Sequence, residues 1–582
     1  MKIHSKTKLS ANFFKGIVLI VFLIMGLNSP KSNAATINVS TINALQTAIN
    51  TSQSGDIIIL ANGTYLNTTL NINKNNITVK AQTPGGVFLN GNNDINIMGN
   101  YITFSGFQIT NGDIGSNYLI EVSGDHNILS HLNISGYYAK KYISVEAGTQ
   151  YNEIIYCNIE KKPADAVIGC TIQISTSETV PGYHKIRYCS FQNYYGIGGD
   201  NGNEPVRIGL GAEYLNKSRT IVEYCYFNNT GMGDSETVSV KCEENIIRFC
   251  TFTNQQNAML CFRNGDTNVA YSNFFINAGG IRVKEANNIF CYNNYFENSG
   301  VGSSAEAVTY MYVAPLVPPT TASPRTLNLS NINFIHNTFY NCGDIDLGGT
   351  GATNNTWANN IFKKSNGSHF NNANTGTTWA GNIYQNNLGI SIPSGMTNIN
   401  PQLGLNSEGY YGLLANSPAI NSASASYPAI YNIPVLDDDF NMLFDISRQA
   451  RPATITQKDV GCDEYTTGTT TNHPLTISEV GPSYLAALSS NTFEVNDANP
   501  IIYPNPAKNS FQLKWPTMIS TNGIISVSNL NGQILQKKEI NQSVFNPENS
   551  ISFEISNFKN GIYFVQILTD TVSKTIKLVV QN

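Results

Sequence analysis

The chain has 582 residues, which is too long for one ordinary domain but suits a repetitive solenoid followed by a further module. Only 13% of the residues are charged and the formal net charge is -5, so the composition excludes the basic balance typical of nucleic-acid-binding proteins. An anionic partner would therefore have to be attracted by a local group of cations rather than by the overall charge.

Residues 1–34 have the features of a secretory signal peptide. Several lysines precede an apolar stretch from Gly16 to Leu27, and Ser32, Asn33 and Ala34 provide a small-residue cleavage site. The apolar stretch is too short for a transmembrane helix, and no later stretch approaches that length. We therefore predict an exported protein with no membrane span after cleavage.

Residues 41–50 predict a short amphipathic helix. Ile42, Leu45 and Ile49 fall on one face, and Thr41 suits the N-cap position. Solenoids need an element that covers the end of their core, so we expect this helix to cap the first coil.

A polar residue followed by an apolar anchor recurs along the middle of the chain at a nearly constant step, such as that from Phe252 to Phe275. Short runs rich in Asn, Ile, Phe, Tyr and Val lie between Asn and Gly turns, and the pattern of leucine-rich repeats is missing. The pattern predicts an all-β fold, a right-handed parallel β-helix over residues 35–465, with Asn side chains stacked in ladders. The anchors are Ile109, Ile134, Ile159, Phe191, Phe227, Phe252, Phe275, Phe296, Phe339, Phe362 and Tyr384.

Three longer steps interrupt the repeat. The steps that begin at Ile159 and Phe191 predict insertions around 160–185 and 195–220, and the step that begins at Phe296 predicts an extra coil or a loop near 301–325. Insertions in solenoids form loops, where binding residues tend to lie.

Ten cysteines in an exported chain could indicate disulfides. Half of them occupy or adjoin the polar position of the repeat, where Asn stands in other coils, so we expect buried thiols that act as small apolar fillers. No Cys-x-x-Cys is present, which disfavours zinc. The five are Cys157, Cys189, Cys225, Cys250 and Cys291.

The repeat fades after residue 390. Residues 391–465 read as an irregular closing region, in which Asp437–Asp439 form a loop, and residues 466–499 read as a linker. Residues 500–582 predict a small β-sandwich-like module that opens with Tyr503-Pro-Asn-Pro506 and has a late strand at Gly561-Ile-Tyr-Phe-Val565.

This module resembles the C-terminal sorting domain of the type IX secretion system. The resemblance implies a partner in the secretion machinery and delivery to the cell surface or the medium. A carbohydrate-binding or immunoglobulin-like accessory module is the alternative.

The repeat predicts where three cationic side chains lie relative to one another. Lys241, Arg263 and Lys284 follow one another at the step of the repeat, so they should stand about 4.8 Å apart on successive coils. Arg282 shares the outward face with Lys284 because side chains alternate along a strand. Asp234 and Glu236 precede Lys241 in the same strand run.

Such a group of side chains suits β-elimination on a uronic acid chain. The proton at C5, beside the carboxylate, must be made acidic and removed by a base, and the O4 leaving group must be protonated. Carboxylates can hold Ca²⁺ to neutralise the substrate carboxylate. A lysine among other cations gives up its proton more readily and can act as the base, and an arginine on the next coil can stabilise charge or deliver the proton.

The same residues resemble the motifs of polysaccharide lyase family 6, the alginate lyases and chondroitinase B. Asn201 precedes Arg207-Ile-Gly, and Asp234-Ser-Glu236-Thr-Val-Ser-Val-Lys241 follows; Arg263-Asn-Gly and Gly-Gly-Ile-Arg282-Val complete the pattern. The resemblance extends from about residue 36 to residue 465.

The resemblance implies that Lys241 is the Brønsted base and Arg263 the Brønsted acid. It implies Ca²⁺ ligands at Asn201, Asp234 and Glu236, and binding of substrate carboxylates by Arg282 and Lys284. The sequence departs from the family pattern at three positions: Asp234 replaces Glu, Cys242 replaces Ser and Asn264 replaces His.

We therefore predict a secreted, Ca²⁺-dependent lyase that leaves a 4,5-unsaturated uronate at the new non-reducing end. Alginate is the expected anionic polysaccharide substrate, and dermatan-type chondroitin is the second candidate. A pectin-type β-helix hydrolase would need paired carboxylates in the groove. A non-catalytic surface adhesin is the remaining alternative.

Overall fold

The computed structural model describes residues 34–163, 168–196, 202–302, 305–312, 329–349, 351–373, 375–431, 433–434, 442–466, 468–485, 501–514, 523–529, 533–540, 551–569 and 573–581. The chain divides into two compact units, residues 1–487 and 488–582. The predicted signal peptide lies outside the described residues apart from Ala34. No helix in the described part of the chain has the length and apolar character that a membrane crossing requires.

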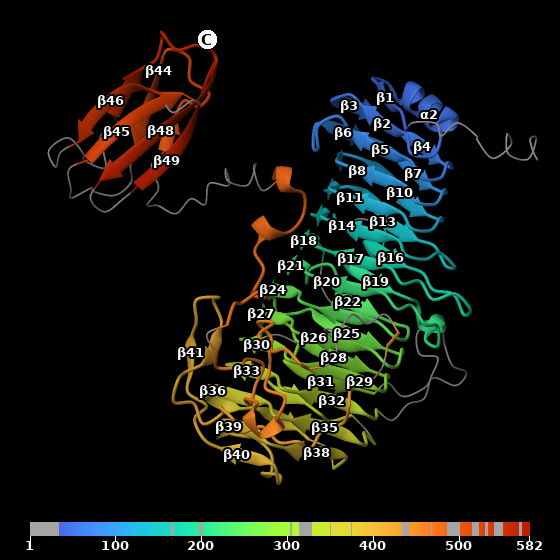
Figure 1. The fold of residues 1–582 in the computed structure, drawn as a ribbon, viewed down its shortest axis with the longest axis vertical. Helices are drawn as coiled ribbons and strands as arrows, with labels where there is room; N and C mark the ends of the chain where they lie inside the picture. Colours follow the sequence, from blue (N-terminus) through green and yellow to red (C-terminus); the bar gives the residue numbers. More distant parts are fainter. Residues whose placement is uncertain are drawn as a thin grey trace, which may run out of the picture. The chain divides into compact units, whose positions relative to one another are not determined.

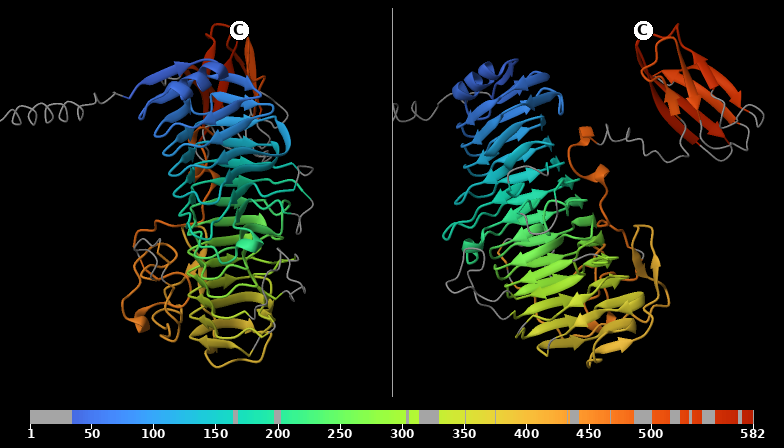
Figure 2. Two further views of the ribbon diagram at one scale, coloured as in Figure 1. Left: turned by 90° about the vertical axis from the view of Figure 1, so that its right-hand side faces the viewer. Right: turned by 180° about the vertical axis from the view of Figure 1, so that it is seen from behind.

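In its described residues, the first unit has three parallel sheets of 14, 12 and 14 strands, and β41 (Leu403–Leu405) pairs antiparallel with β42 (Tyr411–Leu413). One sheet runs from β1 (Thr36–Val39) to β38 (Thr377–Ala380), and another from β3 (Gly63–Leu66) to β40 (Met396–Asn398). Figure 1 shows the strands stacked in sequence order, and the views in Figure 2 show the same stack from two other sides. The predicted all-β parallel solenoid is confirmed.

The 12-stranded sheet carries the residues to which the sequence assigns function. Each coil contributes one strand to it, so neighbouring strands are about one repeat apart in sequence. Its strands are β4 (Thr69–Ile72), β7 (Asp94–Ile97), β10 (Asp113–Val122), β13 (Tyr138–Val145), β16 (Ile172–Ile174), β19 (Val206–Ile208), β22 (Glu236–Val240), β25 (Met259–Arg263), β28 (Ile281–Lys284), β31 (Val308–Met311), β34 (Ile345–Asp346) and β37 (Phe370–Asn372).

Helix α2 (Ile42–Thr51) covers the first coil as predicted. The Thr41 side chain accepts a hydrogen bond from the Ala44 backbone N–H at 3.1 Å, which satisfies one of the free donors of the first turn. Leu45 and Ile49 are fully buried against the core of the solenoid.

The apolar anchors lie in register in the sheet that ends at β40. Ile134 pairs with both Ile109 and Ile159, and the pairing continues through Phe252 to Tyr384. From Phe191 to Phe362 the phenylalanine rings stack at 4.5 to 5.1 Å between centroids. The anchors therefore form one continuous column through the core.

Removing one ring from this column should cost stability. Phe252 is fully buried between Phe227 and Phe275, so Phe252→Ala is expected to lower the free energy of unfolding by about 3–5 kcal/mol. Denaturant titration of the full chain measures this loss. Phe88→Ala is the matched control, because Phe88 is 36% exposed; equal losses in the two variants would contradict the account.

Asparagine side chains form the second internal column. The amide of Asn273 donates to Asn294, Asn294 to Asn337, and Asn337 to Asn360, at 3.0 to 3.1 Å. These bonds satisfy buried amides on successive coils and confirm the predicted ladder. All ten cysteines are buried and free, which confirms that they act as fillers.

The strands on either side of the longest step of the repeat lie on adjacent coils. Strands β30 (Tyr295–Glu297) and β33 (Thr338–Tyr340) pair directly, with Phe296 opposite Phe339. The two strands are therefore one coil apart, as in the regular part of the repeat. Part of each insertion lies outside the described residues.

The closing region packs beside the last coils. Tyr410 contacts Phe274 and Tyr295, and Arg451 donates to Asn293 at 2.9 Å and pairs with Glu464. The region therefore covers side chains that the coils themselves leave at their surface. Asp437–Asp439 lie outside the described residues.

Residues 468–485 also contact the solenoid. Gly481 donates its backbone N–H to Tyr188 O at 2.7 Å, and Leu475 donates to Thr251 Oγ1 at 2.8 Å. Tyr484 reaches the His131 carbonyl at 3.1 Å. The sequence assigns these residues to a linker, but they are attached to the coils; the linker stays a prediction for the rest of 466–499.

The partly buried acid Asp463 in the closing region should make the stability depend on pH. Burial and the neighbouring Asp445 raise the pKa of Asp463 to about 7, against the opposing hydrogen bond from Tyr410 and the charge of Arg451; Asp459 adds to the rise. The folded state therefore binds this proton more tightly than the unfolded state, whose pKa is near 3.8. This contribution to stability is full below pH 4 and is lost as the pH rises towards 7 and beyond.

Asp463→Asn is expected to remove that loss. The variant should gain about 2–4 kcal/mol over the wild type at pH 8 and little at pH 4, because one pKa unit corresponds to about 1.4 kcal/mol. Thermal unfolding of both proteins across this pH range is the measurement. A gain that is the same at both pH values would contradict the assignment.

The second unit contains two antiparallel sheets. They pack around buried side chains that include Phe511, Ile525, Val527, Phe553 and Val565, as the predicted β module requires. The strands are β43 (Ile501–Tyr503), β44 (Ser510–Lys514) and β47 (Ile551–Glu554) in one sheet, and β46 (Ile534–Ile540), β45 (Gly523–Asn529), β48 (Gly561–Thr569) and β49 (Ser573–Val580) in the other.

Candidate active site

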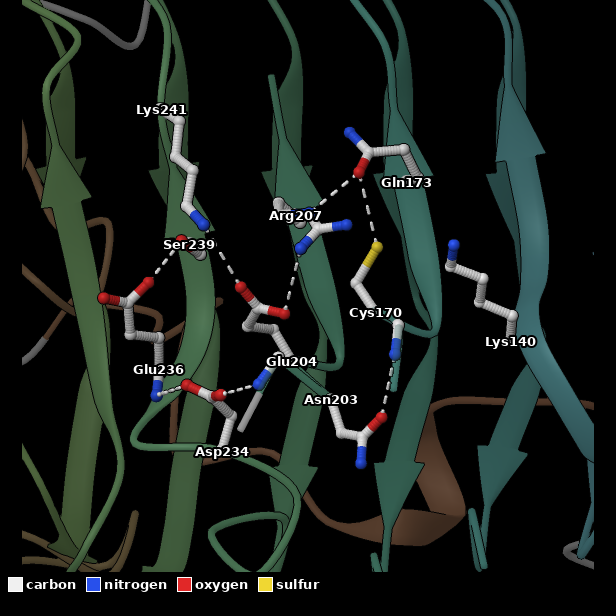
Figure 3. A network of polar contacts seen from close by, with 12 residues as sticks. Lys140, Cys170, Gln173, Asn203, Glu204, Arg207, Asp234, Glu236, Ser239 and Lys241 are labelled. Carbon is white, nitrogen blue, oxygen red and sulfur yellow. Dashed lines mark hydrogen bonds and ion pairs between the residues drawn. The ribbon is translucent and has the colours of Figure 1, made fainter. Parts of the chain in front are cut away.

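Strand β22 positions three of the predicted site residues. Glu236 begins the strand, Asp234 lies two residues before it, and Lys241 follows its last residue. The strand is held between β19 and β25 by parallel pairing. Figure 3 shows the side chains of Asp234, Glu236 and Lys241 with those from the preceding coil.

A buried group of three carboxylates is the centre of the site. Glu204, Asp234 and Glu236 each offer an oxygen, and these atoms lie within 4.8 Å of one another. The three residues are only 2–3% exposed. Within the described residues, this is the group of acids whose spacing suits a metal ion.

Glu204 is the residue that the sequence reasoning missed. It stands two residues before Val206, as Glu236 stands two residues before Val238, and Val206 pairs with Val238 across β19 and β22. Glu204 therefore occupies on one coil the position that Glu236 occupies on the next. The shared position of the two glutamates could have been found by aligning the two coils. The insertion between them makes their separation in the sequence longer than the regular step of the repeat.

Asp234 is held by backbone donors. Its Oδ2 accepts from Gly202 N–H at 2.5 Å and its Oδ1 accepts from Glu236 N–H at 2.9 Å. Burial and the neighbouring Glu204 raise the pKa of Asp234 to about 7, in spite of these bonds. The aspartate is shorter than the glutamate of the family pattern, but its oxygen still lies within 4.8 Å of those of the other two acids.

Glu236 lies among cations. Its Oε1 is 3.3 Å from Arg263 Nη1 and 4.0 Å from Arg282 Nη1, and Ser239 Oγ donates to its Oε2. Burial alone would raise the pKa of Glu236, but the charges of Lys241, Arg263 and Arg282 outweigh it and the pKa is lowered. Glu236 is therefore held as a carboxylate.

Lys241 is placed by Glu204. Its Nζ lies 3.3 Å from Glu204 Oε1, and its side chain is 13% exposed. The other Glu204 oxygen lies 3.5 Å from Arg207 Nη1, and Arg207 Nε donates to Gln173 at 2.8 Å (Figure 3). This chain of contacts over β16, β19 and β22 fixes the amine at the edge of the carboxylate group.

The remaining predicted cations lie on the next two coils. Arg263 ends β25, Arg282 lies in β28, and Arg263 is directly opposite Lys284 in the pairing of these strands. Arg282 Nη1 also lies 3.4 Å from Ser235 Oγ. The structure thus brings Arg263 and Arg282 to Glu236 and puts Lys284 beside Arg263.

Three further positions singled out in the sequence are Asn201, Cys242 and Asn264. Asn201, the predicted third metal ligand, lies outside the described residues. Cys242 and Asn264, which replace the Ser and His of the family pattern, are both fully buried. The substitution at Cys242 therefore affects packing beneath the site.

The donors present fit a calcium ion. Ca²⁺ takes six to eight oxygen ligands and favours carboxylates. Three buried carboxylates whose oxygens lie within 4.8 Å of each other supply such donors, and two of them also accept from or contact cationic side chains. The site therefore has the chemistry of a hard-cation site.

Comparison with known proteins supports this view of the fold. The sequence profile described as chondroitinase B matches residues 39–351, and that described as the secretion system C-terminal sorting domain matches residues 501–581. A search of curated proteins gave no match.

Solved structures of alginate lyases share the fold. The PL6 family alginate lyase AlyGC is 22% identical with a TM-score of 0.60, over 81% of this chain and 60% of that one. A mannuronic acid specific family 6 lyase from human gut microbiota is 20% identical with a TM-score of 0.52, over 63% and 91% of the two chains. The alginate lyase AlyF-OU02, solved with G6, is 17% identical with a TM-score of 0.53, over 67% and 92%.

The sorting domain indicates export through the type IX secretion system to the cell surface or the extracellular space, as the sequence predicts. The first profile covers more than half of the chain (351 − 39 + 1 = 313 of 582 residues). The chain therefore belongs to the chondroitinase B family, whose members are polysaccharide lyases, and carries a secretion sorting domain at its C-terminus.

Proposed function

We propose that this protein is a Ca²⁺-dependent lyase that cleaves alginate by β-elimination. The observation that carries the proposal is the buried group Glu204, Asp234 and Glu236, with a lysine and two arginines around it on adjacent coils. Family membership and the likeness of the fold to alginate lyases support the choice of reaction class.

Lys241 takes the proton from C5 of the uronate in this proposal. Glu204 orients the amine through the 3.3 Å contact, so that the amine stays beside the carboxylate group and near the surface of the sheet. A general base must lie within hydrogen-bond reach of the proton that it removes. The partial exposure of Lys241 leaves room for that approach.

Arg263 protonates O4 or stabilises the charge that develops there. Its guanidinium lies on the coil after that of Lys241, and Glu236 fixes its position at 3.3 Å. Arg282 and Lys284 bind the carboxylates of neighbouring sugars, because both lie on β28, the next strand of the sheet. The bond that breaks is that between C4 and O4, and the product keeps the new double bond between C4 and C5.

Asp234 and Glu236, together with Asn201 and with Glu204 as an additional ligand, would hold a calcium ion. When bound there, Ca²⁺ neutralises the substrate carboxylate and stabilises the negative charge that forms as the C5 proton leaves. Arg263 and Arg282 add positive charge on the same side of the site.

Dermatan-type chondroitin is the second candidate substrate, because the matched profile is that of chondroitinase B. Both polymers contain uronates, and elimination would leave the same conjugated alkene at the new non-reducing end of their different products. The pectin-type hydrolase has little support, since the clustered acids Glu204, Asp234 and Glu236 lie too close together to flank a glycosidic bond and a water molecule.

The test is ultraviolet absorbance of the conjugated alkene after incubation of purified protein with alginate, dermatan sulfate or pectin. We expect absorbance to rise with alginate. A rise with dermatan sulfate alone would change the substrate and keep the reaction. New reducing ends without any rise would contradict the lyase, and no change with any polymer would favour an adhesin.

A further inference from the structure

One outward-facing row of side chains crosses the 12-stranded sheet through the candidate site. The strand pairing places these residues opposite one another without interruption, each on the next coil. In order from β10 to β34, the row is Glu121, Ser144, Gln173, Arg207, Ser239, Cys261, Arg282, Thr309 and Asp346.

The charges along this row change sign twice. Arg207 and Arg282 lie in the middle, on either side of the strand that leads to Lys241, and a carboxylate stands near each end. With about 4.8 Å between strands, Glu121 lies about 14 Å from Arg207 along the row, and Asp346 about 10 Å from Arg282. The cationic middle is therefore bounded by acids on both sides.

Glu121 belongs to a larger acidic group. Asp94, Asp113 and Glu121 line a cavity of about 810 Å³ on β7 and β10, together with Ser116, Asn117 and Tyr118. Burial, Glu146 and Asp94 raise the pKa of Glu121, and Lys141 opposes them. The charges of these acids therefore reinforce one another over this end of the sheet, against one nearby lysine.

Asp346 has acidic neighbours as well. Asp346 and Asp344 both raise the pKa of Glu306, whose burial is the largest cause, while a hydrogen bond from Thr309 and the charge of Arg282 lower it. Glu306 stands two residues before β31, which lies between β28 with Arg282 and β34 with Asp346 in the sheet. This end repeats the arrangement found at β7 and β10.

We propose that these two acidic groups, with Glu121 and Asp346 in the row itself, limit how far a polyuronate chain extends along the sheet. The inference rests on the proposed function. Cations on successive strands favour a chain that runs along the row, with its carboxylates over Arg207, Arg282 and their neighbours. A longer chain brings further carboxylates over the acids, where like charges repel.

Charge and not space sets the limit at the β10 end. The cavity beside Glu121 is large enough to admit more of a polysaccharide, so a purely steric account would predict binding there. The acids make that extension unfavourable. The protein would therefore act best on short segments and gain little from longer chains.

The test compares alginate oligosaccharides of increasing length with Glu121→Gln, Asp346→Asn and the double variant. We expect kcat/KM for long chains to rise about 2- to 5-fold, the size expected for partly exposed charge pairs, with no change for the shortest substrate. The gain should shrink at high salt because screening weakens the repulsion. Glu160→Gln is the matched control, since Glu160 lies in β15 (Asn158–Glu160) of another sheet.

Binding is measured in parallel with Lys241→Ala as the background, so that turnover does not consume the oligosaccharides. If the neutral variants show the same length dependence as the wild type in both assays, the inference is overturned. The proposed function still stands in that case, provided that the wild type is active as a lyase. Weaker binding of long chains by the neutral variants would also overturn it, because the acids would then attract substrate through cations. If the wild type is inactive but its binding shows the expected length dependence, the proposed function is rejected. The limit that the acids set on chain binding is then supported.

Discussion

Replacing Lys241 by alanine is expected to lower kcat for alginate cleavage by about 10²- to 10⁴-fold, the usual contribution of a general base. The loss should appear in kcat more than in KM, because Arg263, Arg282 and Lys284 still bind the substrate carboxylates. Initial rates of absorbance increase, measured over a range of alginate concentrations, separate the two parameters.

One control and one further variant make this result specific. Lys185→Ala removes an exposed lysine from β17 (Lys185–Arg187), in another sheet, and should leave kcat unchanged. Glu204→Gln keeps the amine but removes both its 3.3 Å partner and one carboxylate of the proposed calcium site, so we expect a loss of kcat that added Ca²⁺ does not fully restore. A Lys241→Ala variant that folds normally by circular dichroism and retains its activity would contradict the assignment of the base.

Removal of divalent cations should abolish activity and lower the thermal stability. Glu204, Asp234 and Glu236 are buried together, so a bound cation offsets their mutual repulsion only in the folded state. Ligand linkage gives a stabilisation of about 2.7 kcal/mol at a Ca²⁺ concentration 100-fold above Kd. Unfolding is measured with EDTA, with added Ca²⁺ and with added Mg²⁺, which demands a stricter octahedral geometry.

The variant Glu236→Gln tests where the cation acts. It should lose most of the Ca²⁺-dependent rise in Tm, because one of the three carboxylates is gone. Glu153→Gln, on β14 (Glu153–Ile155), removes an acid from another sheet and should keep the rise. A Ca²⁺ effect of equal size in Glu236→Gln and wild type would place the cation elsewhere.

The solenoid and the pairing of Arg263 with Lys284 could be predicted because a repeat fold turns sequence spacing into spatial distance. Arg263 and Lys284 are one repeat apart in the sequence and directly opposite in the structure, and the anchors from Ile109 to Tyr384 pair in one sheet. Each coil contacts only its neighbours, so the spacing of residues in adjacent repeats determines most of the contacts in the fold.

The spacing of the repeat did not predict the site residues in coils that contain insertions. Glu204 contributes to the carboxylate group from the coil before that of Glu236, and the insertion between them puts it beyond the range of the regular repeat. The contact of Tyr484 with His131 joins two distant parts of the chain, which no periodicity could indicate. Likewise, the hydrogen bonds that attach residues 468–485 to the coils could not be predicted from the repeat.

The measurement that tests the central claim most directly is cleavage of alginate in water labelled with heavy oxygen, followed by mass spectrometry of the products. Elimination breaks the bond between C4 and O4 without adding water, so we expect unlabelled products whose new non-reducing ends are lighter than those of hydrolysis by one water. Incorporation of one labelled oxygen at each cut would show hydrolysis and would contradict the roles proposed for Lys241 and Arg263.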